Sequence, residues 1–235
     1  MRRLRLLTAG ESHGPGLIGV LEGMPAGLTV STAIVNRDLR RRQHGYGSGR
    51  RMQIERDRVR WTGGIRFGRT LGSPIGFAVD NLDWQNWQAR MAVEASTTED
   101  RPRPITRARP GHVDLAGAIK YDAADIRDVL ERASARSTAI RVVGGSLARR
   151  LLHFAGVRIW SFVDQVGPIR AFPGADDVVR RVPDGWPAAD LRRPSPLRCP
   201  DPEAERAMLA EIDAVREAGD SIGGSFVVVA ERMPI

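Results

Sequence analysis

Cysteine is almost absent from this chain of 235 residues, and its scarcity limits the chemistry that the protein can use. Cys199 is the only cysteine, so no intramolecular disulfide can form and a cysteine-rich zinc site is excluded. Such a sequence suits a reducing compartment. We therefore expect a cytoplasmic protein without a metal site.

Long apolar runs are missing as well. No segment approaches the roughly 20 apolar residues that a membrane-spanning helix needs. The basic start of the chain does not predict a signal peptide, because Thr8-Ala9-Gly10-Glu11 ends the first apolar run too soon. We therefore expect no membrane partner.

Lysine is the third shortage, since Lys120 is the only one. Arginine consequently carries almost all of the positive charge, which gives a net charge of +8 and a pI near 11.0. Guanidinium groups make forked contacts with phosphates and carboxylates, and this favours an anionic ligand, either a phosphorylated metabolite or a nucleic acid. A codon bias toward Arg, Ala and Pro explains the bulk charge equally well.

The densest arginine cluster surrounds a glycine turn in "RDLRRRQHGYGSGRRM", residues 37–52. Glycine lets a backbone approach a phosphate closely. Tyr46 is the only aromatic residue of the cluster, whereas single-stranded nucleic acids are bound on aromatic platforms. We therefore favour a small anion and expect no nucleic-acid partner.

The remaining composition is that of an ordinary globular protein, with 42% hydrophobic and 27% charged residues, and predicts one domain over residues 1–235. Residues 101–114 contain too many prolines for a helix or a central strand and predict a stiff, extended loop. Short apolar segments predict strands at 4–7, 17–21, 52–54, 59–61, 75–79 and 157–163.

Three helices are expected from apolar spacing and capping residues. They cover 31–42, with Ser31 as the N-cap; 125–152; and the segment from Asp201-Pro202 to Gly219. The run Phe226-Val227-Val228-Val229-Ala230 is continuously apolar, which is typical of a strand buried on both faces. That run predicts that partners for its sheet or its faces lie outside this chain.

Arg136 falls on the apolar stripe of the helix expected at 125–152, so its charged side chain should point inward. A buried guanidinium needs an anion, which is either an internal carboxylate or a ligand. The small neighbours Ala133, Ser134 and Ala135 leave room beside it and favour a ligand cavity.

The stretch Gly10-Glu11-Ser12-His13-Gly14 fits the G-x-S-x-G pattern of a hydrolase nucleophile elbow. An elbow joins a strand to a helix, however, and here a second strand is expected to follow. Ser12 is therefore a poor nucleophile candidate. His13 is better placed for chemistry, because a histidine on a glycine-rich tip can reach a ligand and exchange protons near neutral pH.

His112 ends the proline-stiffened loop in "RPGHVD", beside Asp114 and after Arg107 and Arg109. A rigid segment with arginines and a histidine can hold an acid next to an anion, although a solvated basic loop is the simpler alternative. His44 and His153 have no such neighbours, and we interpret both as structural.

Four stretches together resemble successive signature blocks of chorismate synthase: "GESHGPGLIGVLEGMP" (10–25), "RRRQHGYGSGRRMQIERD" (40–57), "RPRPITRARPGHVD" (101–114) and "ERASARSTAIRVVGGSL" (131–147). The resemblance extends to "GDSIGG" at 219–224. It implies an α+β fold in which helices are sandwiched between two antiparallel β-sheets, incomplete here at the C-terminus, and a homotetramer.

The resemblance also implies a lyase of the shikimate pathway, which leads to the aromatic amino acids. Members eliminate phosphate from 5-enolpyruvylshikimate 3-phosphate in an anti-1,4 sense to give chorismate, with reduced FMN but no net redox change. Some reduce their flavin with NADPH and others depend on an outside reductant, so both options stay open. The substrate is a small phosphorylated metabolite.

By motif, His13 resembles the acid near the departing phosphate, and His112 the histidine that sets the protonation of the reduced flavin. The stretch Arg132-Ala133-Ser134 resembles the segment that touches FMN. The substrate- or NADPH-binding arginines of the family correspond to Arg42, Arg51, Arg109 and Arg136.

Two departures from the family pattern are visible. Ser48 stands where the family usually has an arginine associated with substrate or NADPH, and Arg50 is a possible substitute. Members also continue beyond this point into a part with further FMN contacts and a catalytic aspartate. The resemblance thus covers an N-terminal portion, and a catalytically inactive anion-binding or assembly module of the same fold is the alternative function.

Overall fold

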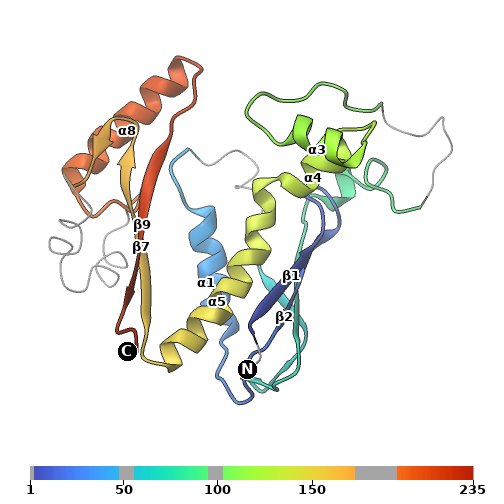
Figure 1. Cartoon of the computed structure of the whole chain (residues 1–235), viewed down its shortest axis with the longest axis vertical. Helices are drawn as coiled ribbons and strands as arrows, with labels where there is room; N and C mark the ends of the chain where they lie inside the picture. Colours follow the sequence, from blue (N-terminus) through green and yellow to red (C-terminus); the bar gives the residue numbers. More distant parts are fainter. Residues whose placement is uncertain (1–2, 48–55, 95–102, 173–194, 235) are drawn as a thin grey trace. The chain divides into compact units, whose positions relative to one another are not determined.

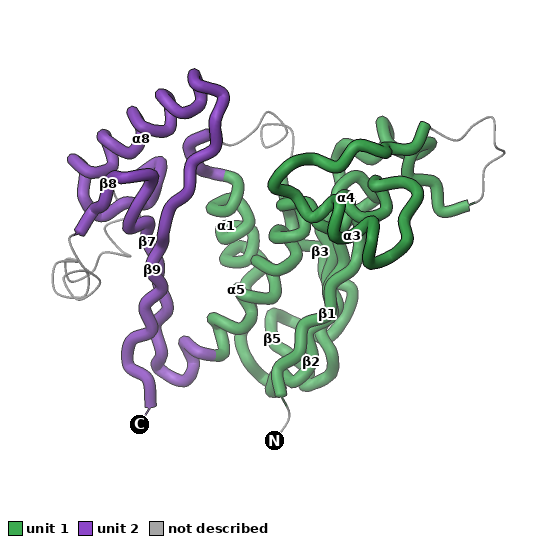
Figure 2. The backbone as a smooth tube through the Cα atoms, turned by 45° about the horizontal axis from the view of Figure 1, so that its top comes forward, with its two compact units in different colours: residues 1–43, 49–151 green, residues 44–48, 152–235 purple. Residues whose placement is uncertain are grey.

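The computed structural model describes residues 3–47, 56–94, 103–172 and 195–234 (Figure 1). The chain divides into two compact units, coloured separately in Figure 2. The first unit comprises residues 1–43 and 49–151, and the second comprises residues 44–48 and 152–235. Helices occur with antiparallel sheets in both, which is the expected α+β class. A single domain over residues 1–235 stays a prediction.

The first unit contains a four-stranded antiparallel sheet in the order β1-β2-β6-β3. Its strands are β1 (Arg5–Ala9), β2 (Gly16–Glu22), β6 (Ile75–Asp80) and β3 (Val59–Gly63). Strands predicted at 4–7, 17–21, 59–61 and 75–79 are therefore confirmed, and the one predicted at 52–54 lies outside the described residues. A small hairpin of β4 (Ile65–Arg66) and β5 (Arg69–Thr70) follows β3.

Two helices cover one face of this sheet. The first, α1 (Thr32–Gln43), begins where predicted, and the Ser31 Oγ accepts a bond from the Ile34 amide at 3.4 Å. The second is α5 (Thr138–Phe154). Side chains from both helices and the sheet form a common core, which includes Leu17, Leu21, Val35, Leu39, Ile75, Phe77, Ile140, Val143 and Leu147. Burial of each large side chain contributes roughly 1.5–3 kcal/mol.

The single helix predicted over 125–152 is wrong. The segment consists of α4 (Arg127–Ala133), the short 3-10 turn η2 (Ala135–Ser137) and α5. Ser134 separates them in an extended conformation, with φ −64° and ψ 147°, and its Oγ accepts from the Arg136 amide at 3.3 Å. A serine at this point caps the next helical turn instead of continuing the previous one.

The region before α4 contains few regular elements. A 3-10 turn, η1 (Trp84–Asn86), follows β6, and residues 103–113 form neither helix nor strand, as predicted for the proline-rich loop. Helix α3 (Asp114–Tyr121) comes next. The loop is held to the start of α4, because Ile105 and Ile126 pair through their backbones at 2.9 Å.

The second unit is a three-stranded antiparallel sheet with one helix. The sheet has the order β8-β7-β9, from β8 (Ile169–Arg170), β7 (Arg158–Val166) and β9 (Gly224–Glu231). Helix α8 (Pro202–Glu217) is capped as predicted, since Asp201 accepts from the amides of Glu203 and Ala204. Phe162, Met208 and Cys199 lie in its core.

Strand β9 corrects another expectation. It is not buried on both faces, because Phe226 and Val228 are exposed while Val227 and Val229 pack toward the core. Of the strands in the described ranges, it pairs only with β7 and lies at the edge of its sheet. The continuous apolar run therefore alternates between two environments.

Candidate functional site

The glycine-rich motif at residues 10–15 is the tip of the β1–β2 hairpin. Gly10 has φ +102°, and a Cβ there would lie 2.4 Å from the Gly16 carbonyl oxygen, so only glycine fits. Asn81 holds the other side, donating from Nδ2 to the Gly14 carbonyl at 2.8 Å. Since a strand follows the tip, it lacks the strand-to-helix turn of a nucleophile elbow, and Ser12 is buried.

His13 is clamped by Glu131, which lies 118 residues away in α4. The His13 amide donates to Oε2 of Glu131 at 2.9 Å, and the ring Nδ1 lies 2.9 Å from both carboxylate oxygens. The ring also stacks on Trp87, with centroids 3.7 Å apart. His13 keeps 22% of its side chain exposed and Glu131 only 1%. The ring is thus fixed in orientation while part of it stays accessible.

Trp87 and Glu131 share further arginine contacts. The Arg127 guanidinium lies over the Trp87 ring at 5.7 Å and donates from Nη1 to Glu131 at 3.3 Å. The Trp87 indole also donates to Asp83 at 2.8 Å. Sequence reasoning missed both Glu131 and Trp87. The two tryptophans of "DWQNW" were the only local signal for Trp87. The residues next to Glu131 in the chain gave no indication that it contacts His13.

His112 belongs to a second, more local group with Arg109 and Asp114. The His112 Nδ1 bonds to Oδ1 of Asp114. Arg109 donates to the same carboxylate from its backbone amide at 3.1 Å and from Nε at 2.8 Å. The hydrogen bonds from Arg109 hold the pKa of the Asp114 carboxyl well below its usual range, with His112 adding to the effect. The structure thus brings into contact three residues that the sequence places within six positions of one another.

Electrostatics link the two histidine groups. The pKa of Arg109 is raised, mainly by its bond to Asp114, and the charge of Glu131 adds to the shift. The carboxylate that holds His13 therefore also acts on the arginine that holds His112. Both groups lie in the first unit.

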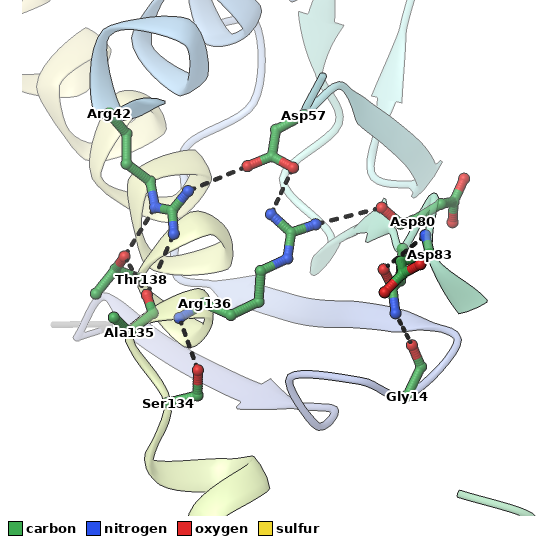
Figure 3. A network of polar contacts seen from close by, with 10 residues as sticks. Gly14, Arg42, Asp57, Asp80, Asp83, Ser134, Ala135, Arg136 and Thr138 are labelled. Atoms are coloured by element: carbon green, nitrogen blue, oxygen red, sulfur yellow. Dashed lines mark hydrogen bonds and ion pairs between the residues drawn. The ribbon is translucent and has the colours of Figure 1, made fainter. Parts of the chain in front are cut away.

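Arg42 and Arg136 converge on one buried carboxylate, Asp57, and we call these two arginines the arginine pair (Figure 3). Arg136 donates from Nη1 to Oδ1 at 2.5 Å, and Arg42 from Nη1 to Oδ2 at 3.2 Å. Arg42 also donates to Thr138 and to the Ala135 carbonyl. Arg136 is buried as predicted, but its anion is the internal carboxylate of Asp57 and not the ligand that its small neighbours favoured.

The segment Arg132-Ala133-Ser134 runs between the His13 group and the arginine pair. Arg132 donates from Nη2 to the carbonyl and hydroxyl of Thr8, at the end of β1, at 3.0 and 2.7 Å. Its buried Nη1 has no hydrogen-bond partner among the described residues. Ala133 is exposed, and Ser134 is the extended break after α4. An orphaned donor beside an open backbone turn is suited to an acceptor from a ligand.

Residues 80–83 tie these groups together, because the Asp80 carbonyl accepts from Arg136 and Asn81 holds the hairpin tip (Figure 3). Arg42 and Arg136 are joined through Asp57, and the Arg136 amide bonds to Ser134. His13 is held by Glu131 and Arg132 is bonded to Thr8, all within the first unit. Arg51 and Ser48 lie outside the described residues.

Two further features are missing from the described part of the chain. No three His, Cys, Asp or Glu side chains gather there in a way that could hold a metal ion. Among the same residues, no helix has the length and apolar character needed to cross a membrane.

Comparisons with known proteins agree with one another. The family model described as chorismate synthase matches residues 4–235. The chain is 50% identical to the chorismate synthase of Symbiobacterium thermophilum, covering 98% of this chain and 59% of the relative, and 52% identical to that of Desulforudis audaxviator, covering 98% and 57%. A crystal structure of a chorismate synthase matches with a TM-score of 0.74 and 37% identity, over 99% of this chain and 60% of that one. The expected fold is confirmed, and the chain spans less than two thirds of the relatives' length.

Proposed function

Because the chain belongs to the chorismate synthase family, we propose that it carries out that family's reaction, the anti-1,4-elimination of phosphate from 5-enolpyruvylshikimate 3-phosphate to chorismate with reduced FMN. The observation that carries the proposal is the pairing of each motif histidine with a buried carboxylate in one unit. A carboxylate at Nδ1 fixes the tautomer and orientation of an imidazole that transfers protons.

In this reaction the substrate loses a phosphate and a proton. We assign to His13 the role of supplying a proton to the departing phosphate. Because Nδ1 of His13 is bonded to Glu131, the transferred proton is carried on Nε2. His112, held by Asp114, is assigned to the protonation state of the reduced flavin. No protein residue changes its redox state in this scheme.

The arginines supply the positive charge that a doubly anionic substrate requires. Two guanidiniums share one carboxylate in the arginine pair, which leaves a net positive charge in a buried setting where it acts strongly. Arg109 adds a half-exposed guanidinium. Asp57 also orients Arg42 and Arg136 before a ligand arrives, which reduces the cost of reorganisation. We assign Arg51 the same role.

The residues at 132–134 fit a flavin. Arg132 offers as a donor its buried Nη1, which has no partner among the described residues, and Ala133 and Ser134 leave the backbone open at the break after α4. Reduced FMN would supply electron density to the reacting bond there without net oxidation or reduction. We also propose that NADPH is the flavin reductant and that the protein is located in the cytoplasm.

We also propose self-association, and a homotetramer in particular. The outer face of the first unit's sheet exposes Leu7, Ile18 and Val20, which lie on adjacent strands. Ion pairs Arg5–Glu22 and Arg60–Asp80 flank this apolar patch. An apolar centre with a charged rim is typical of interfaces between protein chains. Sedimentation equilibrium tests the idea: Ile18→Arg should lower the oligomeric state, and a monomeric wild type would contradict it.

The decisive experiment for the reaction is an anaerobic assay of the 235 residues and of the complete gene product. With reduced FMN and substrate, phosphate and chorismate should appear in equal amounts, and neither should appear with oxidised FMN alone. A complete gene product that binds reduced FMN but releases no phosphate would contradict the proposal. The relatives share one name, so the inactive-module alternative has no support from them.

A further inference from the structure

We propose that Glu131 is a positioning residue that sets the tautomer and ring orientation of His13, a role that rests on the proposed function of His13. Glu131 does not need to touch the substrate in order to act. It determines which ring nitrogen of His13 carries the proton that is transferred.

Several contacts to the hairpin tip meet at Glu131. Its carboxylate accepts from the His13 amide and faces Nδ1 with both oxygens at 2.9 Å. Its backbone carbonyl accepts from the Ser12 amide at 2.9 Å. One residue of α4 therefore holds two consecutive residues of the hairpin tip, through backbone and side chain together.

The Glu131 side chain is also buried. Only 1% of the Glu131 side chain is exposed, so the carboxylate is not satisfied by bulk water and depends on its protein partners. The stack on Trp87 limits rotation of the His13 ring from its face, and Glu131 limits it at the edge. With Nδ1 bonded to a carboxylate, the neutral ring carries its hydrogen on Nδ1 and presents Nε2 as the exchanging atom.

The competing explanation is that Glu131 serves only as the counter-ion of Arg127 four residues earlier. The distances favour His13, since Arg127 Nη1 lies 3.3 Å from Oε1 whereas the two nitrogens of His13 lie at 2.9 Å. The two explanations differ in whether loss of the charge changes the histidine.

Glu131→Gln tests this, because it keeps the shape and removes the charge. Glu205→Gln is the matched control, since Glu205 is also a buried helical glutamate but belongs to the second unit, in α8. We expect kcat of Glu131→Gln to fall roughly 10- to 100-fold with KM nearly unchanged, part of the roughly 100- to 10,000-fold that a positioned proton-transfer group contributes. Glu205→Gln should keep the wild-type kcat, and Glu131→Asp should recover part of the loss.

A spectroscopic measurement makes the result independent of turnover. In ¹⁵N NMR at a pH where the imidazole is neutral, wild-type His13 should show Nδ1 protonated. Glu131→Gln should show a mixture of both tautomers, because an amide can donate as well as accept. Identical His13 nitrogen shifts in wild type and Glu131→Gln would overturn the proposal.

A double-mutant cycle separates this proposal from the proposed function. If Glu131 acts through His13, Glu131→Gln should add less than about 3-fold to the loss caused by His13→Ala alone. Fully multiplicative losses would overturn the positioning role while leaving chorismate synthesis intact. A wild type that shows the Nδ1 tautomer but no phosphate release would instead count against the proposed function.

Discussion

Each of the two histidine groups holds an imidazole against a buried carboxylate, but the groups are built in different ways. His13 takes its carboxylate from Glu131, 118 residues away, whereas His112 takes it from Asp114, two residues away. The arginines also differ, because the side chain of Arg127 is 16% exposed and that of Arg109 is 53% exposed. One group depends on the packing of a hairpin against α4, and the other is contained in one loop and the start of α3.

The two histidine groups therefore depend on the tertiary fold to different extents. The His13 contact forms only when β1, β2 and α4 are in their native places, so its geometry is a property of the whole first unit. The His112 contact requires only a stiff loop of a few residues. Loss of the His13 contact should therefore affect global stability, whereas loss of the His112 contact should affect mainly the local order of its loop.

The largest expected effects are on kcat, and they should be of similar size for the two histidine groups. His13→Ala and His112→Ala should each lower kcat by roughly 100- to 10,000-fold, because a positioned proton-transfer group acts in the transition state. Substrate binding should change by less than about 3-fold, since the arginines remain. Steady-state kinetics with reduced FMN provide the measurement, and wild-type turnover in either variant would refute its assigned role.

Stability should separate the groups. Glu131→Ala should destabilise the chain by about 3–5 kcal/mol, because it leaves the largely buried Arg127 and the His13 amide without their acceptor. Asp114→Ala should cost clearly less, since the exposed Arg109 guanidinium can turn to water. Urea unfolding of both variants would test this, and equal losses would remove the distinction between long-range and local construction.

Acid should weaken the His112 group in a defined range of pH. The pKa of Asp114 is depressed, so its contribution to stability is complete above its unfolded value of about 3.9 and is lost as pH falls through the lower folded value. The difference in melting temperature between wild type and Asp114→Asn should therefore be constant near neutral pH and shrink below about pH 4. A difference that grows in acid would have the wrong sign for this account.

The smallest effect is expected from Trp87→Phe, which keeps an aromatic surface under His13. We expect a change in kcat of less than about 3-fold, because stacking contributes only about 0.5–1.5 kcal/mol beyond area burial and most of it survives. Trp87→Ala should have the larger effect of the two. A loss in Trp87→Phe as large as that of His13→Ala would mean that the indole itself takes part in the chemistry.

Local signals made much of the fold predictable. Ser31 and Asp201 predict where α1 and α8 begin, because an N-cap side chain bonds to backbone amides within three residues of its own position. The periodicity of apolar residues was a less reliable guide to helix boundaries. Arg136 is buried as predicted, although the continuous helix behind that prediction is interrupted by Ser134, whose preference for a cap outweighs the apolar spacing.

The site was predictable to the extent that its contacts are local. Arg109, His112 and Asp114 lie within six residues, so their spacing alone indicated a group. Glu131, Trp87 and Asp57 could not be found in this way, because each meets its partner only through the tertiary fold. The apolar run at 226–230 misled for a related reason, since the sequence does not say which face of an edge strand is covered.

His13 and His112 are assigned different roles, and the ionisation of bound reduced FMN distinguishes between them. Absorbance of the bound reduced flavin, followed against pH, should be displaced in His112→Ala and unchanged in His13→Ala, while both variants lose phosphate release. The same flavin titration in wild type and His112→Ala, or an equal displacement in His13→Ala, would contradict the account.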